Sequence, residues 1–199
     1  MKPIHEEEYK GLKIKIYQDE DAGNPREECD EAGTMVCWHG RYTLGDKHNF
    51  SDPEAFREWW KENGKGGVLL SLFLYDHSGI TMRATEGENP FSCPWDSGQV
   101  GFIYVTRETI IKEWGKRGKQ KAINYLKGEV KTYDDYLTGD VYGYVVEGPD
   151  GEELDSCWGY YGDYDDKDYG ALLEAKSVAD RHAKGIKSAD EMEKSAFAL

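Results

Sequence analysis

The chain has 199 residues, 38% of them hydrophobic, and a formal net charge of −14. This length suits a single folded domain that buries a core without disulfides or metals. The negative surface field disfavours nucleic acid and anionic membranes as partners, but it remains compatible with proteins that have a basic surface.

Two sequence patterns predict the compartment. No run of about 18 apolar residues is present, so no membrane-spanning helix is expected, and residues 1–10 lack the apolar segment of a secretory signal. In a chain without an export signal, the cysteines are expected to be reduced thiols: Cys29, Cys37, Cys93 and Cys157. We therefore expect a cytoplasmic protein.

The start of the chain combines strand patterns with charged segments. Residues 1–10 are charged and are expected to fray. Residues 11–18 alternate apolar and polar side chains, which predicts a half-buried strand. Residues 19–31 hold seven acidic residues against Arg26, a composition typical of a solvated loop. Residues 34–44 are rich in β-forming types and predict a second strand.

A helix is predicted over residues 53–63. Asp52 followed by Pro53 is a strong start signal, in which the carboxylate caps the first turn, and Gly64 supplies the stop. The aromatic residues of this segment are spaced three and four apart and form one face, which is expected to pack on a sheet: Phe56, Trp59 and Trp60.

The middle of the chain, residues 75–105, is the stretch around which the rest is expected to be organised. Residues 68–75 form a nearly continuous apolar run, which predicts a central strand buried on both faces. A turn and a returning strand over 80–83 follow. A loop rich in Gly, Pro and Ser then leads into a strand over 99–105. We interpret the whole stretch as a core hairpin around an ordered loop.

Helical segments are predicted after this stretch. Thr106 is a suitable N-cap for a helix from Arg107. A second helix is predicted over 119–127, with Gly128 as a breaker, and a third over 132–137.

The last third of the chain contains the clearest hairpin. Strands over 140–147 and 153–161 flank a Gly-Pro-Asp-Gly turn. An acidic turn over 162–170 precedes a helix over about 169–185, and residues 186–199 resemble a tail. Short connections between strands predict an α+β fold with a mainly antiparallel sheet and helices packed on one side. One domain is expected over 1–185.

The central loop offers a candidate catalytic site. Cys93 has the chemistry of a nucleophile, His77 that of its base and Asp96 that of the group that orients the imidazole, with Asp76 as an alternative orienting group. The simpler interpretation places His77 in a hairpin turn and Asp96 in an Asx turn.

Three Cys-Trp units recur, at Cys37-Trp38, Cys157-Trp158 and, with an intervening proline, Cys93-Trp95. In a strand, the adjacent Cys and Trp side chains would point to opposite faces of the sheet. A zinc site using these cysteines with His39 or His77 is the alternative, but the close ligand pair typical of such sites is missing. Small, buried thiols are the favoured interpretation, and no metal or cofactor is predicted.

Two charged segments can each be interpreted as a solvated surface or as a ligand-binding site. Residues 107–131 form a basic island that interleaves aromatic side chains and could contact phosphate, but a solvated helix face is favoured. The acidic turn lacks the ligand order of a calcium loop, so a solvated turn is favoured there as well. The aspartates of this turn are Asp163, Asp165, Asp166 and Asp168.

The words HSGITM, PFSCPWDSGQVGFIYV and DSCWGYYG, with LKGEV, TYDDYL and VYGYVVE between the last two, resemble an uncharacterised group of phage, plasmid and other mobile-element proteins. The resemblance covers roughly residues 69–162. It carries no assigned activity or catalytic residue. It implies a context in which small acidic proteins often act by binding host machinery, here inside the host cell.

The leading hypothesis is an acidic, non-enzymatic binding protein of a phage or mobile element. It would engage a host protein with a basic surface, such as a defence or nucleic-acid-processing factor, through the acidic segments 19–31 and 150–168. Tyrosines among these acids suit the anchors of binding hot spots. The predicted binding residues are Tyr160, Tyr161, Asp163, Tyr164, Asp165 and Asp166. The alternative hypothesis is an enzyme or small-ligand protein that uses the central-loop site.

Overall fold

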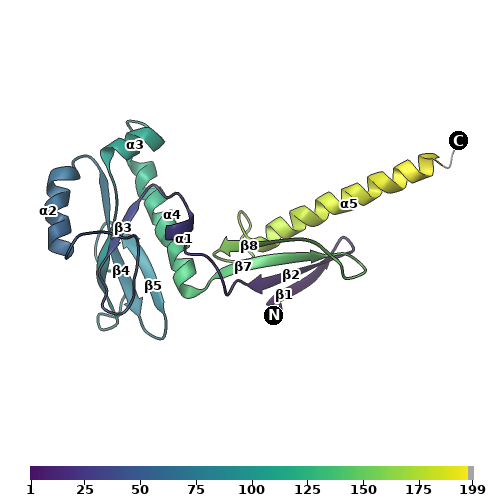
Figure 1. Cartoon of the computed structure of the whole chain (residues 1–199), viewed down its shortest axis with the longest axis horizontal. Coiled ribbons are helices and arrows are strands. Elements are labelled where there is room, and N and C mark those ends of the chain that lie inside the picture. The colour runs from purple at the N-terminus through teal and green to yellow at the C-terminus, as the bar shows by residue number, and fades with distance from the viewer. Residues whose placement is uncertain (197–199) are drawn as a thin grey trace. The chain divides into compact units, whose positions relative to one another are not determined.

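Figure 1 shows the computed structural model, which describes the backbone of residues 1–196 and the side chains of residues 1–185. The chain forms two compact units. The inserted unit is Gly23–Thr138, and the terminal unit combines Met1–Ala22 with Gly139–Leu199. Each unit has its own four-stranded antiparallel sheet, with several helices in the inserted unit and one in the terminal unit, so the predicted α+β class is confirmed. One domain over residues 1–185 stays a prediction.

The terminal unit is a meander with one long helix. Its strand order is β1-β2-β7-β8, and every neighbouring pair is antiparallel. The apolar residues of β2 lie against α5 and confirm the predicted alternation. The elements are β1 (His5–Tyr9), β2 (Leu12–Gln18), β7 (Val141–Glu147), β8 (Glu153–Tyr161) and α5 (Ala171–Ala196).

Both ends of the terminal unit differ from expectation. The prediction that residues 1–10 fray is wrong for residues 5–9, because β1 pairs with Leu12–Ile16 of β2 through a tight turn at Lys10 and Gly11, both with positive φ. Helix α5 runs to Ala196, so residues 186–196 of the expected tail continue the helix. Residues 197–199 lie outside the described part of the chain.

The inserted unit is a sheet in the order β3-β6-β4-β5. The predicted central position of the 68–75 strand is confirmed, because β4 pairs with both β5 and β6. Alternate residues of β4 pack against α4, and the opposite face of the sheet carries α2. The elements are α1 (Pro25–Glu28), β3 (Thr34–Cys37), α2 (Pro53–Asn63), β4 (Val68–Asp76), β5 (Ile80–Thr85), β6 (Ser97–Val105), α3 (Arg107–Trp114) and α4 (Lys119–Thr138).

Helix α2 forms as the sequence predicts. The Asp52 carboxylate accepts a hydrogen bond from the Ala55 amide, and the Gly64 amide bonds to the Trp60 carbonyl at the other end. Phe56 is fully buried, and its ring lies 5.1 Å from that of Phe102. The aromatic face therefore packs on the sheet, as expected.

Three predicted features of the inserted unit are wrong. Residues 75–105 are not a hairpin, because β5 and β6 pair with opposite edges of β4. The backbone hydrogen-bonding groups along both edges of the apolar β4 need partners, and each edge pairs with one strand. The second strand ends at Cys37 rather than at 44. Gly128 does not break α4, because its exposed position costs only about 1 kcal/mol, which the packing of the buried residues beside it offsets.

Within the described residues, no helix has both the length and the apolar character that crossing a bilayer requires.

Candidate functional site

The three residues of the predicted catalytic set meet at one end of the inserted sheet. His77 lies in the turn between β4 and β5, and Cys93 and Asp96 lie in the loop before β6. Nδ1 of His77 is 3.3 Å from Oδ2 of Asp96, and Sγ of Cys93 is 3.4 Å from the same oxygen. The carboxylate thus stands between thiol and imidazole, whereas a nucleophile–base–orienter set places the imidazole in the middle. A catalytic role stays a prediction.

Local hydrogen bonds hold this loop in place. The Ser97 hydroxyl donates to the Cys93 carbonyl at 2.5 Å and accepts from the Asn89 side chain at 2.9 Å. The amide of Asp76, at the end of β4, donates to the Asp96 carbonyl at 2.7 Å. The loop is therefore tied to the start of β6 and to the end of β4, which explains its turn-rich sequence.

Further polar side chains surround the same end of the sheet, and one of them, Arg41, was not predicted from the sequence. A pocket of about 300 Å³ is lined by His39, Arg41, Asp76 and Asp96 together with Trp95, whose side chain is 92% exposed. Arg41 pairs with the Asp76 carboxylate, and Nε2 of His39 lies 3.9 Å from the same group. The only sequence signal was the His-Gly-Arg segment directly after β3, and its partner is 35 residues away.

The cysteines do not gather into a metal site. Among the side chains of residues 1–185, no three His, Cys, Asp or Glu groups are placed to hold a metal ion. Burial, assisted by Asp46, raises the pKa of the Cys37 thiol to about 12, as a small buried thiol requires. Cys157 is exposed, which differs from the expectation of a buried thiol, and Cys29, for which no burial was predicted, is exposed as well.

The strand alternation expected for the Cys-Trp units is observed. Cys37 packs into the core that faces α4, whereas Trp38 packs with the aromatic cluster beneath α2. In β8, Cys157 lies on the side of Tyr144, and the Trp158 ring covers Gly143 on the other face, where a Cβ would come within 2.3 Å of the indole. A bulge in the β7–β8 pairing accompanies this packing.

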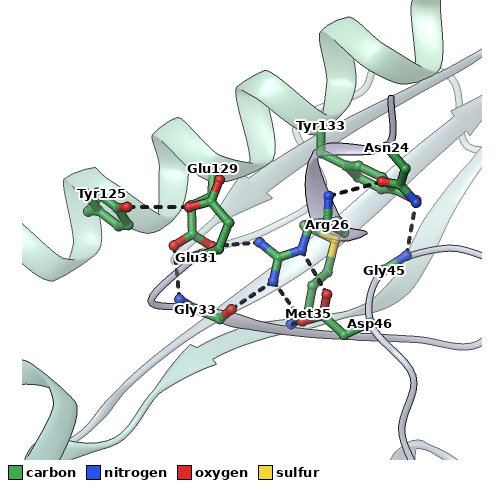
Figure 2. Close-up of polar contacts among 10 residues, drawn as sticks. All are labelled: Asn24, Arg26, Glu31, Gly33, Met35, Gly45, Asp46, Tyr125, Glu129 and Tyr133. Carbon is green, nitrogen blue, oxygen red and sulfur yellow. Dashed lines mark hydrogen bonds and ion pairs between the residues drawn. The ribbon is translucent and has the colours of Figure 1, made fainter. Parts of the chain in front are cut away.

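The acidic segment 19–31 contains a buried cation that its composition does not reveal. Instead of a solvated loop, residues Pro25–Glu28 form helix α1, and the Arg26 side chain is 3% exposed. Figure 2 shows its guanidinium between two carboxylates. Asp46 accepts two hydrogen bonds, at 2.8 and 2.6 Å, and Glu129 on α4 accepts one at 2.8 Å. The prediction failed because these partners lie 20 and 103 residues away.

The carboxylates of this network also hold the backbone of the inserted unit. Glu129, with a side chain 2% exposed, accepts the Gly33 amide at 2.9 Å, and Asp46 accepts the Met35 amide at 2.7 Å. Burial lowers the pKa of Arg26, but the two carboxylates more than offset this and raise it. Burial raises the pKa of Glu129 to about 7, against the opposing effects of the Gly33 amide and Arg26.

A cavity of about 740 Å³ lies beside this network. Its wall mixes charges of both signs, including Glu31, Lys112 and Glu113, with the rings of Trp114 and Tyr125. The Tyr125 hydroxyl donates to Glu31 at 3.3 Å (Figure 2). The charged groups of this network are paired with one another. The network therefore acts as a clamp that fixes α1 to α4.

The basic island falls on α3 and α4. Several of its lysines pair with carboxylates: Lys112 with Glu113, Lys127 with Glu86 and Lys131 with Asp135. These pairs reduce the positive charge that the island presents to a phosphate group.

The predicted binding residues lie in the terminal unit, at the end of β8 and in the turn before α5. Asp163, Asp165 and Asp166 are exposed, and Asp166 accepts the amides of Asp168 and Tyr169 at 2.8 and 3.0 Å, which lowers its pKa. The tyrosines are less free than the sequence suggested. Tyr160 and Tyr164 are partly buried against the core of this unit, and Tyr161 is half-buried.

Two further tyrosines complete this region: Tyr169, which belongs to the tyrosines expected to act as anchors, and Tyr144, which was not predicted. Tyr169 is 84% exposed, although its amide is held by Asp166. Tyr144 on β7 is buried, with its ring 5.8 Å from that of Tyr160. Both border a pocket of about 380 Å³ between β7, β8 and the first turn of α5. Comparison of the chain with protein-family models, with curated proteins and with solved structures found no match.

Proposed function

We propose that the chain is an acidic, non-enzymatic binding protein of a phage or mobile element, which acts in the host cell on a host protein with a basic surface. A defence or nucleic-acid-processing factor is the kind of host protein that fits, because such proteins carry basic surfaces of their own. The acidic turn and β8 of the terminal unit would supply the contact.

The uneven distribution of charge is the observation that carries this proposal. Most of the net charge of −14 belongs to the terminal unit. Its aspartates at 163, 165 and 166 are exposed, and backbone amides rather than lysines or arginines hold the Asp163 and Asp166 carboxylates in place. Their charge therefore remains available to a partner, and it would speed association and make it sensitive to salt.

A triple variant tests the proposal. Asp163→Asn/Asp165→Asn/Asp166→Asn removes three charges while each amide side chain keeps a carbonyl oxygen to accept the local hydrogen bonds. We expect it to bind the host partner roughly tenfold more weakly at low salt, which corresponds to about 1.4 kcal/mol. Affinity capture from host lysate identifies the partner, and binding of the purified pair is then measured at two salt concentrations.

The matched control removes the same charge from the other unit. Glu54→Gln/Glu58→Gln/Glu62→Gln changes three exposed residues of α2 and is expected to leave binding unchanged. Equal loss in both triple variants would show only a net-charge effect. Unchanged binding of the aspartate variant, or no specific partner, would refute the proposal.

A second candidate function is an enzyme or small-ligand protein that uses His77, Asp96 and Cys93. The observation in its favour is that His77 and Cys93 both contact Asp96, which lines the 300 Å³ pocket. Because Asp96, and not His77, contacts the thiol, we expect Cys93 to react with iodoacetamide no faster than the exposed Cys157. Mass spectrometry of each alkylated peptide measures both rates. A Cys93 rate at least tenfold higher that falls in His77→Ala would support the enzyme instead.

A further inference from the structure

The pocket between β7, β8 and α5 is built largely from aromatic rings and carboxylates. The rings of Tyr144, Tyr160 and Tyr169 line it, with the carboxylates of Asp168 and Glu174. Its volume of about 380 Å³ suits one long side chain or a small ligand. From this cavity we infer that the terminal unit receives a cationic side chain, an arginine or lysine, of its protein partner. The inference rests on the proposed function, since it assigns a docking point to that basic partner.

The electrostatics of the pocket favour a cation over a neutral or anionic group. The side chains that line it include no lysine, arginine or histidine within the described part of the chain. Burial, and then Asp155, Cys157 and Glu174, raise the pKa of Tyr144. Burial, and then a hydrogen bond with Cys157, raise that of Tyr160. Both phenols therefore stay neutral, and aromatic rings attract cations at their faces.

Tyr169 has the position of an anchor at the rim. Its ring is 84% exposed, yet its backbone is fixed because its amide donates to Asp166 and the next amide, of the buried Gly170, donates to the Asp166 carbonyl at 3.0 Å. Because the backbone at Tyr169 is already ordered, binding has to fix only its side chain. Tyrosine is also one of the residues enriched in binding hot spots.

One resident cation competes with the proposed ligand. Nη2 of Arg181 lies 3.4 Å from Oε1 of Glu174, but both side chains are exposed, so water screens this ion pair and keeps it weak. An incoming arginine or lysine can therefore replace it. Removal of Arg181 should consequently strengthen binding of a cationic probe, a result that a purely structural role for Glu174 would not give.

The test uses a blocked peptide, Ac-Gly-Gly-Arg-Gly-Gly-amide, and its lysine analogue as probes of the full chain. Peptides with citrulline or acetyl-lysine at the middle position keep the shape and remove the charge. Tyrosine ring resonances are followed by NMR during titration at 150 mM salt. We expect saturable shifts at Tyr160 and Tyr169 with the charged peptides and at least fivefold weaker binding with the neutral ones.

Three variants separate the pocket from general acidity. Tyr169→Ala is expected to weaken binding at least fivefold and Arg181→Ala to strengthen it about twofold, whereas Tyr42→Ala in the inserted unit should have no effect. Equal shifts with the citrulline peptide, or unchanged binding in Tyr169→Ala with native ring dispersion elsewhere, would overturn the inference. Peptide binding without any host partner would leave the pocket intact and refute only the proposed function. If the Tyr169→Ala variant still binds the host partner, the proposed function would stand and the inference about the pocket would be refuted.

Discussion

Replacement of Arg26 with alanine is expected to lower the free energy of unfolding of the inserted unit by about 3–5 kcal/mol. The substitution leaves the Glu129 carboxylate buried without its cation and releases Asp46 and the Gly33 carbonyl, which all accept from the guanidinium. The cost of an unpaired buried charge, rather than the net value of the ion pair, sets this magnitude. The measurement is urea unfolding at pH 8 followed by tryptophan fluorescence, since Trp158 alone among the six tryptophans lies outside the inserted unit.

Two further variants make this result specific. Arg117→Ala removes an exposed arginine from the same unit and is expected to change stability by less than about 0.5 kcal/mol. Arg26→Met/Glu129→Met removes both charges and should recover part of the loss, because the fully buried Glu129 carboxylate is no longer left without its cation, whereas the more exposed Asp46 still loses its partner. A loss below about 1 kcal/mol in Arg26→Ala would show that water reaches Glu129 and that the clamp is not closed.

The stability of the inserted unit is expected to decrease by about 3 kcal/mol between pH 4.5 and pH 7 through Glu129 alone. Its pKa is about 7 in the folded chain and 4.5 in the reference state. A raised folded-state pKa means that the folded state binds more protons in this window. The contribution is fully present below pH 4.5 and is lost as the pH rises through 7.

Glu129→Gln isolates this group from the other acids of the chain. The amide is neutral at every pH, so the difference in unfolding free energy between wild type and variant should change by about 3 kcal/mol across the window. Urea unfolding curves at pH 5.0, 6.0 and 7.5, from which the midpoint and the slope together yield the free energy of unfolding, give this difference. A constant difference across the three values would show that the Gly33 amide and Arg26 keep the carboxylate ionised throughout.

Elements with signals a few residues apart could be predicted from sequence. Helix α2 begins at the Asp52 cap and ends before Gly64, and the β7–β8 hairpin turns at residues 148–151, because each signal is local. Gly128 misled the prediction, since its exposed position lets the buried neighbours override its low propensity. The prediction for residues 1–10 failed as well. The glutamates of β1 are typical of a solvated segment, and its strand structure depends on pairing with β2.

The candidate sites also differ in whether their residues are close together in the sequence. His77, Cys93 and Asp96 lie within 20 residues of one another, and short loops bring them together. Arg26 sits in an acidic segment whose composition indicated solvent, and only tertiary contacts reveal its burial. The aromatic pocket needed Tyr144 from β7, which no nearby motif connects to Tyr169.

The position of the inserted unit between β2 and β7 has a kinetic consequence. These strands are neighbours in the terminal sheet, and the Asp19 amide bonds to the Val141 carbonyl where the chain leaves and re-enters it. The pairing must therefore form across the whole of Gly23–Thr138, a contact of high sequence separation that is slow to close while that segment is unfolded. Early folding of the inserted unit shortens the effective loop between β2 and β7. The topology therefore favours folding of the inserted unit before these two strands pair.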